Sequence, residues 1–512
     1  MIKQLPGRPD LGQLKKQAKD LLDEIRAANA MALARAEIKT GDTVAIDAFA
    51  LHSAQRVIAR EHGFASWSKL KLHVETRAVE GAAARLIEAA LEGEQEAVDT
   101  ILRERPELAT RSIFSAAALG DESTIRREVQ RTPAAAVAKG GPRDWEPLLY
   151  LCFGRCGGSD AARAVAASAL LPLGANANAT WLHVDWPEAP LPALYGATGV
   201  NNYPRLARGL LEAGANPNDG ESIYHAAEHN HVACLDVLRE FGADFSGRNR
   251  TFGSTPLCFL LGYADATPTV RAGIRWLLEH GADPNTRALV QTINQTALHA
   301  AVANGWDAEM VVLLLRHGAD AALMRADGRT AYALAVRSGR EDVAALLRER
   351  GAAMELGARD VFLGACMRAD ASAAQQVLGA HPGLLATLSM EDRKLPIRAA
   401  KKGLAGALEL FGRFGLHLAV EGEFGEQPLH WAAWHGQVDA VRVLVAGGVP
   451  LAPRDRKFCA PPLGWCGHGS LHCQNPAGEY GSVAEALLAA GAAIDGTEGN
   501  AAVMAAIRRY RK

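Results

Sequence analysis

The sequence predicts an all-α protein built as a solenoid of stacked helix pairs. A leucine-rich helix end that closes on Gly-Ala recurs through the middle of the chain, as in LLEAGANPN and LLEHGADPN. Successive copies are 28 to 40 residues apart, counted between the marker glycines Gly174, Gly214, Gly242, Gly281, Gly318 and Gly351. A second phrase, in which a turn leads into a helix, reads STPLCFLL, QTALHAAV, RTAYALAV and later QPLHWAAWHG. Repetition of one such unit at a fixed period is typical of a solenoid, in which each repeat packs on its neighbours.

The residues of these two phrases have local roles at helix ends. Thr caps a helix by accepting a backbone N–H, and Pro stands in the first turn, where its missing donor costs nothing. Gly can take the left-handed conformation that ends a helix. Together the phrases resemble ankyrin repeats from about Glu80 to Asn500, although the segments before Pro147 and between Gly357 and Phe424 keep only the helix pattern. The resemblance implies an ankyrin-repeat solenoid of about 11–12 helix pairs with an N-terminal helical subdomain.

Five regions are predicted: an N-terminal helical module at 1–78, degenerate helical repeats at 79–145, ankyrin repeats at 146–357, ankyrin-like repeats at 358–500 and a C-terminal cap at 501–512. The module is expected to contain three helices, LGQLKKQAKDLLDEIRAAN, AFALHSAQRVIAREHG and a third from Ser66, with Gly63 as the break before the third. Its sequence resembles a module that precedes ankyrin repeats in bacterial proteins, a resemblance that implies no activity. Arg508, Arg509, Arg511 and Lys512 are expected to give the last helix the polar outer face of a cap.

Composition excludes several classes of function. Lys and Arg number 55 against 57 for Asp and Glu, so there is no overall basic field to attract nucleic acid. The charged N-terminal stretch, and the lack of an apolar run long enough to span a bilayer, predict a cytoplasmic protein with no membrane partner. Eight cysteines in 512 residues do not suggest a disulfide framework and are predicted to be reduced thiols. No cofactor is predicted, because the sequence contains no Gly-rich phosphate loop, nucleophile elbow or kinase signature.

One repeat departs from what stacking needs. The residue after the Thr-Pro-Leu-His phrase packs between repeats, and only His225 of the aligned series titrates near neutral pH; the series reads Tyr150, Gly196, His225, Phe259, Ala300, Leu334, Trp431 and Trp465. If the helix starts at Glu221, then Glu221, His225 and His229 share one face and can hold a metal or a substrate. Glu221, His225 and Glu228 are therefore the catalytic candidates. His225, Glu228 and His229 also spell H-x-x-E-H, an inverted zinc-protease motif. The alternative is a polar interface between repeats, with Glu228 and His229 in solvent.

The preceding repeat strengthens the binding interpretation, because Asn201 and Asn202 stand where Gly and His usually close the first helix. Adjacent repeats are then expected to align side chains along one groove, and the predicted ligand-binding set is Tyr150, Tyr195, Asn201, Asn202, Tyr224, His225 and His229. Trp181 or Trp186, from the long loop 176–192, is expected to lie over this groove. Aromatic walls with a few polar groups are typical of a ligand pocket, although each aromatic residue alone is also explained as core.

A second cluster contains ligand types that zinc uses, namely Cys459, Cys466, His468, His472 and Cys473. Its spacing matches no paired-cysteine knuckle, and Cys466 aligns with the small Ala of the repeat, so packing explains it. No metal is predicted, and the alternatives for one rest on His225, His229, Cys466 and His468. His299 and His430 occupy the His position of the repeat phrase and are interpreted as structural.

Two functional interpretations follow. The first is an interaction protein that binds a protein or peptide on the concave face of the solenoid. The second is an enzyme or small-molecule-binding protein with a site built from residues 145–231, in which His225 and Glu221 perform acid/base or metal-assisted chemistry. The repeat start Asp-Gly-Glu-Ser favours the second, because it lacks the Thr-Pro capping that a stacking repeat prefers.

Overall fold

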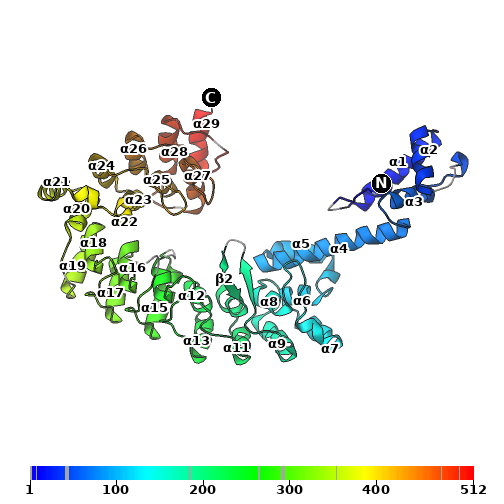
Figure 1. The fold of residues 1–512 in the computed structure, drawn as a ribbon, viewed down its shortest axis with the longest axis horizontal. Helices are drawn as coiled ribbons and strands as arrows, with labels where there is room; N and C mark the ends of the chain where they lie inside the picture. The colour runs from blue at the N-terminus through cyan, green and yellow to red at the C-terminus, as the bar shows by residue number, and fades with distance from the viewer. Residues whose placement is uncertain are drawn as a thin grey trace. The chain divides into compact units, whose positions relative to one another are not determined.

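The structure is a computed structural model, and its two compact units, Met1–Asp244 and Phe245–Lys512, are described separately. Helices dominate both units (Figure 1). The residues that the structure describes are 3–6, 9–40, 45–183, 186–262, 266–289, 294–352, 354–473, 475–494 and 496–511.

The N-terminal module contains four helices rather than the three predicted. They are α1 Leu11–Arg26, α2 Ala30–Thr40, α3 Leu51–Glu61 and α4 Trp67–Glu92, with the short 3-10 turn η1 Ile46–Ala48 before α3. The prediction missed α2, a short segment whose two buried alanines, Ala32 and Ala36, give little amphipathic signal. Asp10 caps α1 by accepting the backbone N–H of Gln13. Gly63, with φ 81°, separates α3 from α4, as expected.

Helix α4 joins the module to the repeats within the first unit (Figure 1). Leu70 and Val74, near its start, belong to the core of the module, which also contains Leu14, Leu21 and Ile58. The end of α4 contacts α5 and α6 instead. The predicted boundary at residue 78 therefore falls inside one continuous helix.

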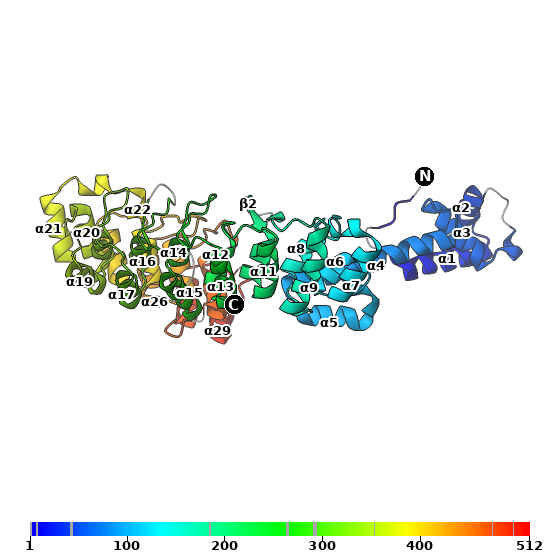
Figure 2. The ribbon, with the colours of Figure 1, turned by 90° about the horizontal axis from the view of Figure 1, so that it is seen from below.

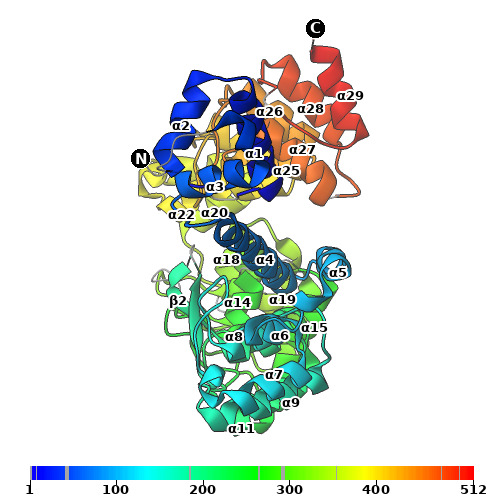
Figure 3. The same ribbon diagram turned by 90° about the vertical axis from the view of Figure 1, so that its right-hand side faces the viewer.

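The rest of the first unit is a run of helix pairs. After α4 its elements are α5 Gln95–Glu104, η2 Pro106–Leu108, α6 Ile113–Leu119, α7 Glu122–Arg131, η3 Pro133–Ala136, α8 Pro147–Phe153, α9 Asp160–Leu170, η4 Leu171–Leu173, β1 Thr180–His183, β2 Trp186–Pro192, α10 Ala193–Tyr195, the π-helical turn η5 Gly196–Val200, α11 Pro204–Glu212, α12 Ser222–Glu228 and α13 Val232–Glu240. The first helices of the pairs contact one another in sequence, from α6 through α8 and α10 to α12. The second helices α7, α9, α11 and α13 form the other row (Figures 1 and 3).

The long loop predicted at 176–192 forms a β-hairpin. Strands β1 and β2 pair antiparallel, with Thr180 opposite Pro192 and Trp181 opposite Leu191, and the register shifts between Leu182 and His183. In Figure 2 this hairpin stands on the same edge of the first unit as the loops that join the helix pairs. Successive residues of a strand point to opposite sides, so Trp181 is half-buried while Leu182 is 59% exposed.

The second unit continues the same helix-pair plan. Its elements are α14 Pro256–Gly262, α15 Pro268–Glu279, α16 Ala297–Asn304, α17 Ala308–Arg316, α18 Ala331–Arg337, α19 Glu341–Glu349, α20 Ala358–Met367, α21 Ala371–Ala380, η7 Leu384–Thr387, α22 Met390–Arg393, α23 Leu395–Lys401, α24 Ala405–Arg413, α25 Pro428–Trp434, α26 Val438–Ala446, α27 Pro462–His472, α28 Tyr480–Ala489 and α29 Ala501–Tyr510. Within the described ranges, five pairs in the first unit and seven in the second agree with the predicted all-α solenoid of about 11–12 pairs.

The repeat phrases act locally as predicted. Thr296 and His299 form a reciprocal cap at the start of α16, with His299 Nδ1 2.7 Å from the Thr296 hydroxyl. Gln427 and His430 repeat this arrangement at α25. Burial, followed by the charge of Arg325, lowers the pKa of His299 to about 4, so this imidazole is neutral and structural.

A buried ion network joins α18, α20 and α22 in the second unit. Arg337 lies 2.7 Å from Asp392, and their side chains are 1% and 0% exposed. Arg329 contacts Asp392 at 3.1 Å and Asp360 at 2.8 Å. Buried charges need such partners, because an isolated one is strongly disfavoured.

The last helix, α29, buries Val503, Ala506 and Ile507 and leaves Arg508 and Arg509 exposed. Lys512, the last residue of the predicted cap, lies outside the described residues. All eight cysteines fall within the described ranges and none forms a disulfide. Of the helices described, not one combines the length and the apolar character needed to cross a bilayer.

Candidate functional site

A line of touching rings crosses four successive repeats of the first unit. Neighbouring ring centroids along this line lie 4.9 to 5.9 Å apart. We call it the aromatic row, and its members in order of contact are Phe114, Tyr150, Trp145, Trp181, Phe153, Tyr195 and His225. Helices α6, α8, α10 and α12, strand β1 and the turn before α8 supply these residues, so stacking of the repeats creates the row.

Only part of the aromatic row reaches the surface. Trp145 and Phe153 are 7% and 6% exposed and form its floor. Trp181, Tyr195 and His225 are half-buried and form its outer edge. The indole Nε1 of Trp181 is buried without a hydrogen-bond partner in the described chain. An unsatisfied donor of this kind costs about 1–3 kcal/mol.

His225 sits between two carboxylates of its own helix turn. Its Nδ1 lies 2.8 Å from Glu228 Oε2, and its Nε2 lies 3.4 Å from Glu221 Oε2. Burial alone would lower the pKa of His225, but the hydrogen bonds to Glu221 and Glu228 outweigh it and raise that pKa to about 9. His225 is therefore an imidazolium at neutral pH, with both ring nitrogens occupied.

Asp219 binds backbone donors just before the helix that carries His225. Its carboxylate accepts the backbone N–H groups of Glu221 at 2.9 Å and Ser222 at 2.8 Å, and the Ser222 hydroxyl at 2.6 Å. Burial of this carboxyl outweighs those hydrogen bonds and raises its pKa to about 6. The helix begins at Ser222, and Asp219 accepts the N–H of this first residue, whereas Thr in other repeats accepts the N–H of the third helical residue. The repeat start Asp-Gly-Glu-Ser therefore satisfies a backbone donor at the helix start without the Thr-Pro phrase, and this structural role is an alternative to a catalytic explanation of the sequence.

A π-helical turn brings Tyr195 against His225. The turn η5 follows Tyr195 directly, and π-helical turns of this kind are frequent at functional sites. A Cβ added at Gly199 would lie 2.6 Å from the Tyr195 ring and 2.8 Å from His225 Cβ. Glycine is therefore required there, because only the absence of a side chain lets the two rings approach to 5.0 Å.

Three members of the predicted ligand-binding set face inward, which corrects the sequence interpretation. Tyr150 is 0% exposed, and its hydroxyl donates to Gly140 O at 2.9 Å and accepts from Arg143 N. Asn201 is 8% exposed and donates to the carbonyl oxygens of Cys152 in the preceding repeat and of Gly196 in its own repeat. Tyr224 is 6% exposed. These side chains hold the repeats together from within.

The other predicted members are accessible. Asn202 is exposed, and its side-chain oxygen accepts from the Cys234 thiol at 3.4 Å. His229 is also exposed, but it ends α12 and turns back, with Nδ1 2.9 Å from the carbonyl oxygen of His225. The ring of His229 stacks on His231 rather than joining Glu221 and His225. Glu221 and His225 converge as predicted, whereas His229 does not.

The alternatives for a metal gain no support from the geometry. Among the described residues, no three His, Cys, Asp or Glu side chains are grouped so that they could hold a metal ion. Cys466 is 0% exposed and points its thiol toward Tyr480 O, while His468, two residues along α27, is exposed and stacks near Trp434 and His472. The two residues of this candidate pair therefore lie on opposite faces of one helix.

Sequence reasoning missed Arg143, which borders the aromatic row. Its guanidinium lies 5.0 Å from the Trp145 ring and 5.7 Å from the Trp181 ring. It also pairs with Glu88 at 2.7 Å and Glu92 at 2.9 Å on α4. The only signal was the sequence RDWEP before α8, where an Arg and a Trp flank a turn.

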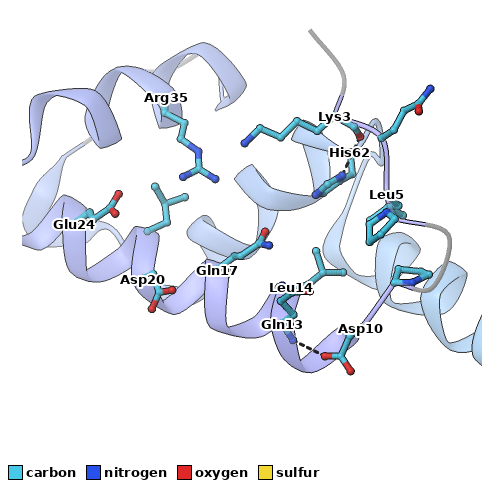
Figure 4. A pocket seen from close by; sticks show the side chains of 14 residues that line it. Lys3, Leu5, Asp10, Gln13, Leu14, Gln17, Asp20, Glu24, Arg35 and His62 are labelled. Atoms are coloured by element: carbon cyan, nitrogen blue, oxygen red, sulfur yellow. Dashed lines mark hydrogen bonds between the residues drawn. The ribbon is translucent and has the colours of Figure 1, made fainter. Parts of the chain in front are cut away.

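A separate hollow of about 710 Å³ lies in the N-terminal module. Figure 4 shows Gln17 and Glu24 of α1 and Arg35 of α2 among the side chains that line it. The basic groups at its wall are already paired, because Lys3 and Arg35 both contact the buried Glu61. Asp10 caps α1 at the far end, and the polar groups of this hollow are largely used by the fold.

Comparisons with known proteins identify the repeats. A family model for ankyrin repeats in three copies matches residues 270–358, and a model for the single ankyrin repeat matches residues 424–456. These segments are ankyrin repeats. Among solved structures, the crystal structure of the human ASB11 ankyrin repeat domain is similar at 21% identity and a TM-score of 0.36, over 48% of this chain and 99% of that chain. No curated protein matches the chain.

Proposed function

We propose that the chain is an interaction protein and that its first unit binds a segment of another protein along the aromatic row. Ankyrin repeats generally mediate interactions between proteins, and they do so by presenting an extended surface built from successive repeats. The observation that carries the proposal is the half-exposed edge of Trp181, Tyr195 and His225 over a buried aromatic floor. The sequence analysis predicted a binding face on the concave side of the solenoid, and we assign this binding role to the edge formed by Trp181, Tyr195 and His225.

The chemistry of this edge favours a peptide with an apolar side chain beside a basic one. Trp and Tyr rings provide large contact areas with little entropy to lose, which is why they dominate binding hot spots. The Tyr195 hydroxyl makes no hydrogen bond with any described residue, so it is free to pair with a peptide backbone. Glu221 and Glu228 place two carboxylates beside His225, and this acidic character favours Lys or Arg in the partner.

The state of His225 argues against this residue as a general base. A general base must accept a proton near neutral pH, and an imidazolium with a pKa of about 9 does not. Both ring nitrogens are also held by carboxylates, which leaves none to face a substrate or a metal. This supports an interaction surface over an enzyme in which His225 is the general base or a metal ligand.

The test is selection of peptides from a random library on the immobilised full chain, followed by affinity measurement with the purified peptides. Trp181→Ala removes the largest side chain of the edge and should weaken binding by about 2 kcal/mol, or roughly thirtyfold. Leu182→Ala is the matched control, because Leu182 is the next residue of the same strand and is 59% exposed on its other side. Its effect should stay within about twofold.

Two results would contradict the proposal. One is selected peptides that bind Trp181→Ala as tightly as the unsubstituted chain while its circular dichroism is unchanged. The other is a consensus without apolar or basic residues.

A further inference from the structure

The second unit contains a cationic cavity that is independent of the aromatic row. Its volume is about 120 Å³, and it lies among the ends of α16, α18 and α23 beside Met367 of α20. Three cations line it, Arg398, Lys401 and Lys402, all from the last turn of α23 or the residue after it. No carboxylate is among the described residues of its lining.

Arg398 is the central group of this cavity. Its guanidinium makes no hydrogen bond and no ion pair with any residue in the described ranges, although it has five N–H donors. Burial, and then the charges of Arg337 and Arg325, lower the pKa of Arg398 to about 10. The negative charge of Glu391 acts in the opposite direction and raises the pKa of Arg398. The Glu391 carboxylate, however, already forms ion pairs with Arg325 at 3.2 Å and Arg337 at 3.1 Å.

The neighbouring groups share this excess of positive charge. The pKa of Lys402 is lowered, first by burial and then by Arg340 and Arg398. Lys402 forms no ion pair with a described residue, and its Nζ lies 3.1 Å from the Cβ position of Gly305. Lys401 is fixed with its Nζ 3.4 Å from the centroid of the Trp431 ring. The hydroxyl oxygen of Ser338, also in the lining, is buried without a partner in the described chain.

Helix ends do not neutralise these charges. The C-terminal ends of α16, α18 and α23 each carry about half a negative charge, which together is less than the charge of Arg398, Lys401 and Lys402. Some carbonyl groups in the last turns of α16 and α18 accept backbone donors, as in Gly305 N to Val302 O at 3.2 Å and Gly339 N to Val336 O at 3.0 Å. A net positive charge therefore remains around a small cavity, with an unpaired guanidinium and a buried hydroxyl in its wall.

We propose that this cavity binds a phosphate group, either free or as a small monoester. The planar guanidinium of Arg398 matches two phosphate oxygens, Lys402 supplies a point charge, and Ser338 supplies a hydroxyl donor. A volume of about 120 Å³ holds one tetrahedral oxyanion but not the rest of a larger ligand, which would extend into solvent. The site is separate from the peptide-binding surface proposed above, so either proposal can fail alone.

The test is calorimetric titration of the full chain at low ionic strength in a buffer without phosphate, because salt screens exposed charges. One arm uses inorganic phosphate and a second uses phosphoserine, with serine as its uncharged counterpart. We expect saturable binding with a Kd on the order of 1 mM or tighter. Tighter binding of phosphoserine than of phosphate identifies a monoester as the ligand, and the reverse identifies the free anion.

Two substitutions and one control locate the binding. Arg398→Gln should weaken phosphate binding about tenfold or more, since hydrogen bonds to charged groups are the strong ones. Lys402→Gln should weaken it about threefold or more, and because Lys402 is exposed this variant should fold even if Arg398→Gln does not. Arg413→Gln, on the adjacent helix α24, is the control and should change affinity less than about twofold. Absence of saturable binding, equal binding of serine and phosphoserine, or equal affinity in Lys402→Gln and the unsubstituted chain overturns the proposal.

Discussion

Helix α12 is expected to become less stable as the pH rises, because His225 loses its stabilising positive charge. Its pKa in the folded chain is about 9, against 6.5 for an unperturbed histidine. A group whose pKa is raised by folding stabilises the fold fully below its unfolded pKa and loses that contribution as the pH rises through its folded pKa. His225 therefore contributes most below pH 6.5 and nearly nothing well above pH 9.

The size of this effect follows from the shift. Each pKa unit corresponds to about 1.4 kcal/mol, so the imidazolium contributes roughly 2.5 kcal/mol at neutral pH and under about 0.5 kcal/mol near its folded pKa. The His225 side chain is 24% exposed, and solvent reduces these values somewhat. His225→Gln removes the charge but keeps a polar side chain of similar length. This substitution should lower the local unfolding free energy of α12 by about 2 kcal/mol at neutral pH and by far less near pH 9.

Two measurements check this prediction. Hydrogen exchange of the α12 backbone amides, in the unsubstituted chain and in His225→Gln, gives the local difference between about pH 6 and pH 9. Nuclear magnetic resonance of the labelled imidazoles gives the pKa directly, with His225 assigned by the signal that the variant lacks. His229→Gln is the matched control, because His229 is exposed and bonds only a backbone carbonyl. A His225 pKa below about 7 would refute the stabilisation of its charge by Glu221 and Glu228. So would a difference in local unfolding free energy between the two chains that does not change with pH.

Two further substitutions test the packing. Gly199→Ala should destabilise the first unit by about 1–3 kcal/mol and displace Tyr195, because the added Cβ would lie 2.6 Å from the Tyr195 ring. Gly209→Ala is the control and should be neutral or stabilising, because an added Cβ there meets nothing within 4 Å. Equal thermal midpoints for the two variants would contradict this prediction. Asp392→Asn should cost about 3–5 kcal/mol of stability in the second unit, measured by urea unfolding, because it leaves the 1%-exposed guanidinium of Arg337 without its closest carboxylate; a cost under about 1 kcal/mol would show that the network rearranges.

The sequence determined the architecture because a solenoid is built from short-range contacts. Each marker glycine ends a helix by its own left-handed conformation, as Gly281 does with φ 94°. His299 caps the helix that it belongs to, three residues from its partner Thr296. Such signals are complete within a few residues, so repeated phrases predicted the helix pairs correctly. Short or irregular segments gave no such signal, which is why α2 and the β-hairpin were missed.

The site depended on contacts between repeats, which only the tertiary structure decides. Asn201 is a polar residue after a turn, and nothing local indicates that it reaches Cys152 O in the preceding repeat. The sequence placed Glu221 beside His225 correctly, because that contact spans one helical turn. The sequence alone could not decide that Tyr150 is fully buried while Tyr195 is half-buried, or that Arg398 has no acceptor among the described residues. Burial and pairing depend on every neighbour in space, and those neighbours are tens of residues away along the chain.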